Sequence, residues 1–427
     1  MKPETLADWL AHIERVHPRA IEMGLERTLK VKQALGLNPS FPIITVGGTN
    51  GKGSACAMLE AILHHAGYKV GCYTSPHLRR YNERVRIACS EARDNDLVRA
   101  FVAVERARGS VPLTYFEFGT LAAMWLFERE RIDVAVLEVG LGGRLDAVNA
   151  FDADCALVMS VDLDHMDYLG DTRDAIAFEK AGIFRHGRPA VCAEPRPPQT
   201  LRHYAAQVGA ELLVIDEDFG YAADKMQWQY RGPHGKRSGL PHPVLRGGYQ
   251  LANASACLTA LDAMRERLPV AMDDIRAGLL QAEVPGRFQV LPGRPVTILD
   301  VAHNPHAVKA LAENLSAMGC SGRTLAVFAM LKDKDIAGVI SVVRKHIDHW
   351  LIAGIEDARG ADAALLLRQL AAAGVTVPIT ACANIAAAYV QACDRATEND
   401  RILVFGSFYT VAAAMQAYEA RKALKPL

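Results

Sequence analysis

The stretch VGGTNGKGS, residues 46–54, decides how this chain of 427 residues folds. It follows a short β-branched run, FPIITV (41–46), and it leads into KGSACAMLEAILHHAGYKV (52–70), which has helical spacing and ends in a second strand. A strand, a glycine loop, a helix and a second strand, in this order, predict a phosphate-binding loop that follows a strand of a parallel sheet.

The loop departs from the common phosphate-binding pattern G-x-x-x-x-G-K-[ST]. Gly53 stands between Lys52 and Ser54, and Val46 occupies the position of the first glycine. We still expect backbone N–H groups and the helix dipole to bind phosphate, with Lys52 reaching the β and γ phosphates. The alternative is that the glycines merely turn the chain, and the loop alone does not separate a hydrolase, a kinase and a ligase. The candidate phosphate-binding residues are Gly48, Thr49, Asn50, Gly51, Lys52, Gly53 and Ser54.

Strands and helices continue to alternate after the loop. DVAVLEV (133–139) and CALVMSV (155–161) are expected strands, TRDAIAFEKAGIF (172–184) is an expected helix, and MQWQYRGPHGKRSG (226–239) interrupts the pattern as a hairpin. This alternation predicts an α/β fold whose N-terminal domain is of P-loop type, with a mostly parallel sheet and helices on both faces.

A domain boundary is expected at VPGRFQVLPGRPVT (284–297), where Pro-Gly pairs cluster and the helical pattern ends. A fresh alternation of strands and helices follows, which predicts a smaller C-terminal domain of Rossmann-like type. We place the domains at residues 1–290 and 291–427. Neither carries G-x-G-x-x-G between its first strand and helix, which counts against a dinucleotide cofactor.

Composition and charge limit the classes of partner and the cellular location that we expect. Lysine plus arginine and aspartate plus glutamate each total 48, so the zero formal charge gives no reason to expect nucleic acid or a membrane as a partner. No run of 18 apolar residues occurs, and the charged stretch 1–28 lacks the apolar core of a signal peptide. The nine cysteines include no CxxC pair, which favours reduced thiols. We therefore expect a cytoplasmic protein that acts on small molecules. Separately from these observations, we expect it to be a monomer.

Three polar side chains lie at or just past the carboxyl ends of expected strands: Ser75, Glu138 and His165. Parallel strands place ligands at this edge of a sheet, beside the phosphate loop. A hydroxyl, a carboxylate and an imidazole there suit Mg²⁺, which takes few protein ligands together with waters and phosphate oxygens. The alternatives are a turn cap before Pro76, a satisfied strand-end carboxylate and a core histidine.

Several further stretches give the chain a family resemblance. Besides GTNGKGS they are YTSPHLRRYNERVRI (73–87), LTYFEFGTLAAMW (113–125), VLEVGLGGRLDAVN (136–149), SVDLDHMDYLGDTRDAIAFEKAGIF (160–184) and DVAHNPHA (300–307). In them the sequence resembles the folylpolyglutamate synthase and dihydrofolate synthase family, within the Mur-type ATP-dependent amide ligases, and the resemblance covers nearly the whole chain. In that family GTNGKGS is itself the phosphate loop. The resemblance implies an ATP-binding domain over 1–290 and a glutamate-ligase domain over 291–427.

The resemblance also implies ATP and two magnesium ions as cofactors. It implies that Lys180, in FEKAGIF (178–184), is carbamylated by CO₂ and helps to hold the second ion. Only an unprotonated amine reacts with CO₂, so burial and neighbouring cations must lower the pKa of this lysine. The alternative is an ordinary lysine that pairs with a phosphate or with Glu179. The candidate metal-binding residues are Ser54, Ser75, Glu138, His165 and Lys180.

The implied reaction is attack of a substrate carboxylate on the γ phosphate of ATP, after which the amine of glutamate displaces phosphate from the acyl phosphate. Such catalysis rests on positioning and charge neutralisation, in agreement with the absence of a G-x-S-x-G motif. The candidate catalytic residues are Lys52, Lys180 and His303. Further nucleotide-binding candidates are Asn253, Arg287 and Asp300, with helix-surface, linker and strand-end roles as alternatives. Val301 departs from the family's usual D-G-A-H-N, and Lys332 and Asp335 receive no role.

The motif GLGGRLDAVN (140–149), which includes Arg144, resembles that of the bifunctional enzymes of the family, which also add the first glutamate to dihydropteroate. A carboxylate at Asp146 suits the amino and ring N–H groups of a pterin, and Phe116 suits its ring. Asp146 could instead cap a turn, and Phe116 could be core. The candidate substrate-binding residues are Phe116, Asp146, Ala147 and Asn304.

We therefore expect glutamate addition to dihydropteroate, giving dihydrofolate, and to tetrahydrofolate, giving polyglutamates. Three alternatives stay open: polyglutamylation alone, another Mur-type amino-acid ligase, and a small-molecule kinase or nucleotide-binding regulator. A cell-wall ligase of the second kind calls for an additional domain before its phosphate loop. ATP turnover that requires both glutamate and a folate, with an amide product, separates the expected enzyme from the kinase and the regulator.

Overall fold

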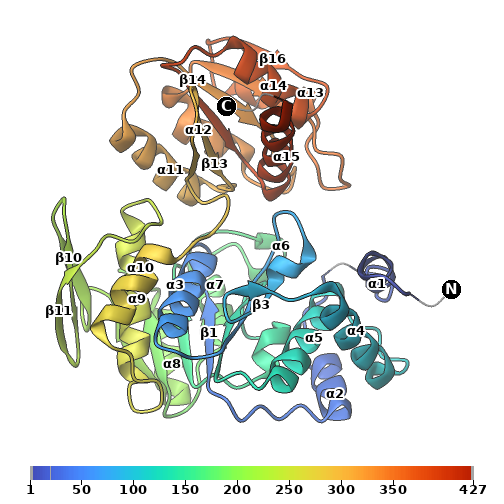
Figure 1. Cartoon of the computed structure of the whole chain (residues 1–427), viewed down its shortest axis with the longest axis vertical. Coiled ribbons are helices and arrows are strands. Elements are labelled where there is room, and N and C mark those ends of the chain that lie inside the picture. Colours follow the sequence, from blue (N-terminus) through green and yellow to red (C-terminus); the bar gives the residue numbers. More distant parts are fainter. Residues whose placement is uncertain (1–2, 20, 425–427) are drawn as a thin grey trace. The chain divides into compact units, whose positions relative to one another are not determined.

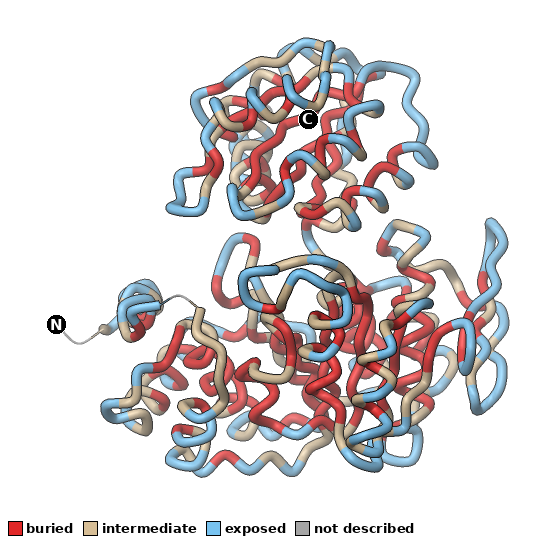
Figure 2. Tube along the Cα trace, turned by 180° about the vertical axis from the view of Figure 1, so that it is seen from behind, coloured by how far each residue is buried: buried red, intermediate tan, exposed pale blue. Residues whose placement is uncertain are grey.

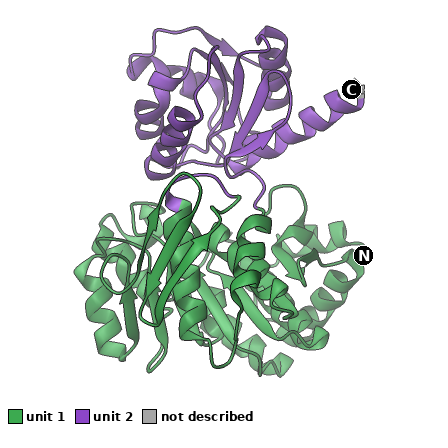
Figure 3. Ribbon diagram, turned by 60° about the vertical axis from the view of Figure 1, so that its left-hand side comes forward, with its two compact units in different colours: residues 1–244, 250–283 green, residues 245–249, 284–427 purple. Residues whose placement is uncertain are grey.

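The chain divides into two units, shown in Figure 3. The computed structural model describes residues 3–19 and 21–424 (Figure 1). The N-terminal unit comprises residues 1–244 and 250–283, and the C-terminal unit comprises residues 245–249 and 284–427. The domain division expected from the sequence, between residues 290 and 291, remains a prediction.

The N-terminal unit is built on an eight-stranded sheet in the order β4-β3-β2-β5-β1-β6-β7-β8. Neighbouring strands from β2 to β8 are parallel, whereas β3 and β4 extend one edge as antiparallel strands. All residues of β1 and β5 are buried, as parallel strands covered on both faces should be. The strands are β1 (Ile43–Gly47), β2 (Val70–Tyr73), β3 (Val85–Ile87), β4 (Ser90–Glu91), β5 (Val134–Glu138), β6 (Cys155–Val158), β7 (Pro189–Cys192) and β8 (Glu211–Val214).

Apolar side chains fix the helices on this sheet. Ile43 and Leu137 of the sheet join one buried core with α2, α4 and α5, whereas Ala156 and Val158 join another with α7 and α8. In Figure 2 the buried positions follow the strands and the helices beside them. The helices of this unit are α1 (Leu6–Ile13), α2 (Glu26–Leu35), α3 (Lys52–His65), α4 (Asp94–Arg108), α5 (Tyr115–Glu130), α6 (Met166–Leu169), α7 (Arg173–Ala181), α8 (Gln199–Val208), α9 (Tyr249–Ala263) and α10 (Met272–Gln281), with 3₁₀ turns η1 (Tyr81–Arg84) and η2 (Ala147–Ala150).

A small antiparallel sheet interrupts the alternation, and it confirms the hairpin predicted from the sequence. Its strands β9 (Gly220–Ala223), β10 (Trp228–Gly232) and β11 (Gly235–Leu240) lie in the order β11-β10-β9. Gly232 pairs with Gly235 across the expected turn. Trp228 and Tyr230 are buried, and the Tyr230 hydroxyl lies 3.0 Å from the Thr259 hydroxyl of α9, which holds the hairpin on that helix.

The C-terminal unit contains a six-stranded sheet in the order β12-β13-β17-β14-β15-β16. β12 is antiparallel to β13, and the remaining pairs are parallel. The strands are β12 (Gln289–Leu291), β13 (Val296–Asp300), β14 (Thr324–Phe328), β15 (His349–Ile352), β16 (Ile379–Ala381) and β17 (Arg401–Phe405). The helices are α11 (Pro305–Met318), α12 (Ile336–Val343), α13 (Ala363–Ala372), α14 (Ile385–Arg395) and α15 (Phe408–Leu424), with the 3₁₀ turn η3 (Arg344–His346).

The predicted fold class is confirmed. A mostly parallel sheet of P-loop type carries the N-terminal unit, and a smaller Rossmann-like sheet carries the C-terminal unit. Among the residues that the structure describes, no helix combines the length and the apolar character that crossing a membrane requires.

Candidate active site

The phosphate loop joins the end of β1 to the start of α3, as the sequence predicts, and two of its glycines are required there. Gly48 has φ +140° and Gly51 has φ +88°, conformations that side chains with a Cβ rarely adopt. A Cβ at Gly48 would lie 3.0 Å from the Met159 backbone nitrogen, and one at Gly51 would lie 2.9 Å from Asn253 Oδ1. The loop is therefore wrapped closely by the segment after β6 and by α9.

Hydrogen bonds hold the loop to the segment that follows β6. The Thr49 amide donates to the Ser160 carbonyl (2.9 Å), and the Asn50 amide donates to Ser160 Oγ (2.9 Å). The Thr49 hydroxyl donates to the Asp162 carbonyl at 3.0 Å. The loop thus has a fixed shape before any ligand binds, which lowers the entropic cost of binding one.

Lys52 and Lys180 are close enough beside the loop that the positive charge of Lys52 affects the pKa of Lys180. Lys52 Nζ donates to the Gly48 carbonyl at 2.9 Å. Lys180, on α7, is 4% exposed, and burial together with the positive charge of Lys52 lowers its pKa to about 7, against the opposing effect of Asp164 and Asp146. A large fraction of Lys180 is therefore neutral near pH 7.

Asp146 lies at the turn after β5, where it caps η2. Its carboxylate accepts from the Leu141 and Val148 amides at 2.9 Å each. Burial raises its pKa to about 7, while these hydrogen bonds and the charge of Lys52 act in the opposite direction. Ala147 is buried next to it. Asp146 thus serves as the turn cap that the sequence left open, and it also belongs to the charged group around Lys52.

Phe116 lies against, and Arg144 belongs to, the turn between β5 and η2, residues 139–146, which contains Gly140, Gly142 and Gly143 (the glycine turn). The Phe116 ring, in the first turn of α5, lies against Gly140, where an added Cβ would come within 2.7 Å of its Cζ, and its centroid is 5.7 Å from that of Tyr73. Arg144 Nη2 donates to Glu179 Oε1 at 2.7 Å, and the Arg144 amide donates to the Glu179 carbonyl at 2.7 Å. The turn that carries Asp146 is thereby fixed to α7 next to Lys180.

Glu138 and Ser75 meet at the ends of β5 and β2. Glu138 is buried, and its Oε2 accepts from the Ser75 amide at 3.0 Å. A Cβ at Gly53 would lie 3.9 Å from Glu138 Oε1, so the first turn of α3 passes directly beside this carboxylate.

His165 lies next to Asp164, whose charge acts on Lys180. Its backbone is left-handed, with φ +50°, and its Nε2 lies 3.9 Å from Asp164 Oδ2. The Asp164 carboxylate in turn raises the pKa of Lys180. The sequence analysis missed Asp164, although the acidic wording DLDHMD around His165 was a usable signal.

Ser54 is connected to Asn253 by a residue that the sequence analysis also missed. Gln250 Nε2 donates to the buried Ser54 hydroxyl at 3.3 Å, and Asn253 Nδ2 donates to Gln250 Oε1 at 2.9 Å. Both side chains belong to α9 and are three positions apart, on a helix that is otherwise mostly apolar. Two buried amides at this spacing were the signal that could have revealed Gln250.

The C-terminal unit gathers its own candidates around Asp300. Asp300 accepts from the Phe288 and Ala302 amides at 3.0 and 2.8 Å, and burial raises its pKa to about 6 against the opposing charge of Arg287. The ring of Phe408 lies 6.5 Å from that of His303 and 5.4 Å from the Arg287 guanidinium carbon.

Asn304 and Asp335 each cap a helix, whereas Val301 is buried and Lys332 is exposed. Asn304 caps α11 by accepting from the Ala307 amide at 2.8 Å. Val301, the departure from the family wording, is fully buried. Asp335 caps α12, and Lys332 is exposed.

Comparisons with known proteins match both units. The model of the Mur ligase middle domain matches residues 46–261, and that of the Mur ligase glutamate ligase domain matches residues 286–408. A protein of Escherichia coli K12 named dihydrofolate synthase/folylpolyglutamate synthase is 44% identical over 418 residues, which cover 98% of this chain and 96% of that protein.

Solved structures agree in fold over almost the whole length. E. coli FolC in complex with DHPP and ADP has a TM-score of 0.93 at 44% identity, with 98% of this chain and 99% of that chain covered. A bifunctional folylpolyglutamate synthase/dihydrofolate synthase with Mn, AMPPNP and L-glutamate bound has a TM-score of 0.90 at 44% identity, with 97% and 98% covered.

Proposed function

Because this chain belongs to the dihydrofolate synthase/folylpolyglutamate synthase family of Mur ligases, we propose that it adds L-glutamate to dihydropteroate and to tetrahydrofolate in an ATP-dependent reaction. The observation that carries the proposal is the rigid phosphate loop, whose Lys52 shares its electrostatic environment with the buried Lys180 and Asp146. The relatives named for this pair of activities resemble the chain over nearly its full length.

ATP is the phosphoryl donor in this proposal. Backbone N–H groups of the loop, apart from those of Thr49 and Asn50 that bond to Ser160, hold its phosphates at the N-terminus of α3, and Lys52 exchanges its loop carbonyl for a phosphate oxygen. The substrate carboxylate attacks the γ phosphorus, the bond to ADP breaks, and an acyl phosphate results. The amine of glutamate then attacks the acyl carbon, phosphate leaves, one proton is released and the amide forms. Lys52 neutralises charge on the transferring group.

A divalent cation fits the side chains beside the loop. Within residues 3–19 and 21–424, no three His, Cys, Asp or Glu side chains gather into a ready-made metal site. A buried carboxylate and a buried hydroxyl near a phosphate loop suit Mg²⁺, which keeps waters and takes phosphate oxygens. When bound, magnesium would neutralise phosphate charge. The residues proposed to hold two such ions are Ser54, Ser75, Glu138, His165 and Lys180.

We propose that Lys180 is carbamylated and that the negatively charged carbamate helps to hold one of the two magnesium ions. The neutral amine forms an N–C bond to CO₂ and releases one proton, which turns a neutral side chain into an anion; a lysine that starts as the ammonium ion loses two protons in all. Support comes from the pKa of Lys180, which burial and Lys52 lower to about 7. The alternative partner, Glu179, bonds to Arg144 through Oε1, and the carboxylates that act on the pKa of Lys180 are those of Asp164 and Asp146.

The other ligands are assigned in the same proposal. Phe116, Asp146 and Ala147 bind the pterin: the Asp146 oxygens have lone pairs beyond those used by Leu141 and Val148. Asn253, Arg287 and Asp300 bind the nucleotide, and His303 and Asn304 serve catalysis and substrate binding. A cytoplasmic location and a monomeric state complete the proposal. The nine cysteines, all free within the described residues, support a reducing compartment.

The test supplies the purified protein with ATP, magnesium and glutamate, and with either dihydropteroate or tetrahydrofolate. We expect ADP, phosphate and a glutamyl amide from both acceptors. Lys52→Met should abolish turnover, whereas Lys69→Met, at an exposed lysine paired with Glu130, should leave it unchanged. Failure with dihydropteroate alone would reduce the function to polyglutamylation, and failure with both acceptors would reject the proposal.

A further inference from the structure

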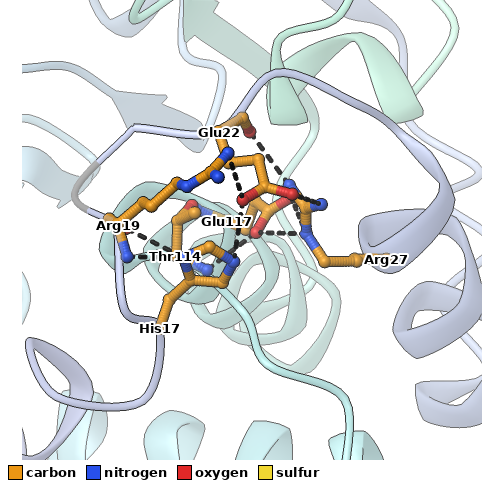
Figure 4. A network of polar contacts seen from close by, with 6 residues as sticks. All are labelled: His17, Arg19, Glu22, Arg27, Thr114 and Glu117. Carbon is orange, nitrogen blue, oxygen red and sulfur yellow. Dashed lines mark hydrogen bonds and ion pairs between the residues drawn. The ribbon is translucent and has the colours of Figure 1, made fainter.

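Arg27, Glu22 and Glu117 form an ion-pair network, drawn in Figure 4 together with His17, Arg19 and Thr114. Arg27 of α2 donates from Nε to Glu117 Oε1 at 3.2 Å, and its Nη2 lies 3.0 Å from the same oxygen. The same guanidinium donates from Nη1 to Glu22 Oε1 at 3.1 Å and from Nη2 to the Glu22 carbonyl at 2.9 Å. Arg27 therefore bridges the segment before α2 and the first turn of α5.

Glu117 is the buried carboxylate of this network and is bonded to the backbone at the start of α5. Its side chain is 4% exposed, its Oε2 accepts from the Thr114 amide at 2.7 Å, and its own amide donates to the Thr114 hydroxyl at 3.3 Å. This capping box sets the start of α5, one residue away from Phe116. Within residues 3–19 and 21–424, Arg27 is the basic side chain that pairs with Glu117. A buried carboxylate that loses such a partner is strongly destabilised, so Arg27 controls how the first turn of α5 is held.

The segment before α2 crosses the turn that presents Asp146. The Gly24 amide donates to the Leu145 carbonyl at 3.4 Å, and Met23 Cε lies 3.5 Å from the position of a Cβ at Gly142. The Arg27 guanidinium thus connects α5, which carries Phe116, to the segment before α2 (residues 22–25, the covering segment). Through Gly24, this covering segment also contacts the turn that carries Asp146.

We propose that Arg27 is a positioning residue for the pteroate substrate. Resting on the proposed function, this assignment gives Arg27 no contact with substrate: it holds Phe116 and the covering segment at the spacing that Asp146 requires. Its loss should therefore weaken pteroate binding and leave nucleotide binding alone, because the phosphate loop is held separately by Ser160 and Asp162.

The experiment compares steady-state constants of Arg27→Gln, Arg27→Lys and the unchanged protein. We expect Arg27→Gln to raise KM for dihydropteroate about tenfold or more, with KM for ATP unchanged within about twofold. Arg27→Lys keeps the positive charge but loses the forked guanidinium that bridges Glu22 and Glu117. Its KM for dihydropteroate should therefore lie between those of the unchanged protein and Arg27→Gln.

The matched control is Arg237→Gln, because Arg237 of the hairpin strand β11 pairs with a similarly buried carboxylate, Asp262 of α9. Its side-chain exposure is 27%, against 20% for Arg27, so loss of thermal stability should be comparable while KM for dihydropteroate stays unchanged. Should Arg27→Gln fail to fold, Glu22→Gln removes the charge that Arg27 meets on the segment before α2, at a more exposed site where His17 and Arg19 also pair with Glu22.

An unchanged KM for dihydropteroate in these variants, or an equal rise in both KM values, would overturn the positioning role. An unchanged protein that forms no amide from dihydropteroate would instead count against the proposed function itself.

Discussion

Lys180 should react with CO₂ at a rate set by its lowered pKa. An ordinary lysine, with a pKa near 10.5, is only about 0.3% neutral at pH 8, whereas a pKa of about 7 leaves about 90% neutral. At pH 6 the neutral fraction with the lowered pKa is about 10%, so the rate of carbamate formation at fixed CO₂ should fall about tenfold between pH 8 and pH 6. For the ordinary lysine the same change would be about a hundredfold.

The assay is incorporation of ¹³CO₂ followed by ¹³C NMR, with the initial rate measured at several pH values. Lys180→Met should abolish the carbamate signal, and Lys69→Met should keep it, because Lys69 lies at the surface. Lys52→Met should move the midpoint of the rate-against-pH curve to higher pH, since the positive charge of Lys52 lowers the pKa of Lys180. A hundredfold fall in rate, or no signal from the unchanged protein at pH 8, would refute the reasoning.

Three further predictions concern single positions. Gly51→Ala should lower the free energy of unfolding by about 1–3 kcal/mol and raise KM for ATP, because the added Cβ strains a left-handed backbone and meets Asn253; denaturation and kinetics measure both. Glu138→Gln should cost at least about a hundredfold in turnover while thermal stability holds, since the amide oxygen still accepts from the same backbone N–H; a turnover within tenfold would contradict this. Asp300 has a pKa raised from 3.8 to about 6 by burial, so it stabilises the fold most below pH 4, and that contribution, up to about 3 kcal/mol, is lost as the pH rises to 6. Asp300→Asn should flatten this part of the curve in chemical denaturation at pH 4 and pH 7, and an equally steep curve would argue against it.

The sequence predicted those parts of the fold that local pattern determines. A β-branched run followed by glycines and a helical repeat gives β1, the phosphate loop and α3 without reference to the rest of the chain. The hairpin around Gly232 and Gly235 is equally local, because turn residues and alternation specify it. The family resemblance then supplied expectations for both units.

Contacts between distant segments were beyond that reasoning. Arg27 and Glu117 are 90 positions apart, and no periodicity connects them. The mutual electrostatic effects of Lys52, Lys180 and Asp146 arise only once the fold brings together the phosphate loop, α7 and the turn after β5. Strand order itself, with β5 between β2 and β1, depends on tertiary packing rather than on any local signal.

The central claim is that the substrate carboxylate takes the γ phosphate of ATP, and oxygen labelling tests it directly. Dihydropteroate with an ¹⁸O-labelled carboxylate, ATP and glutamate would be incubated with the protein, and the inorganic phosphate released would be analysed by mass spectrometry. The account predicts one ¹⁸O atom in each phosphate formed with the amide, because the attacking oxygen leaves with phosphorus. Amide formation that leaves the phosphate unlabelled would contradict it.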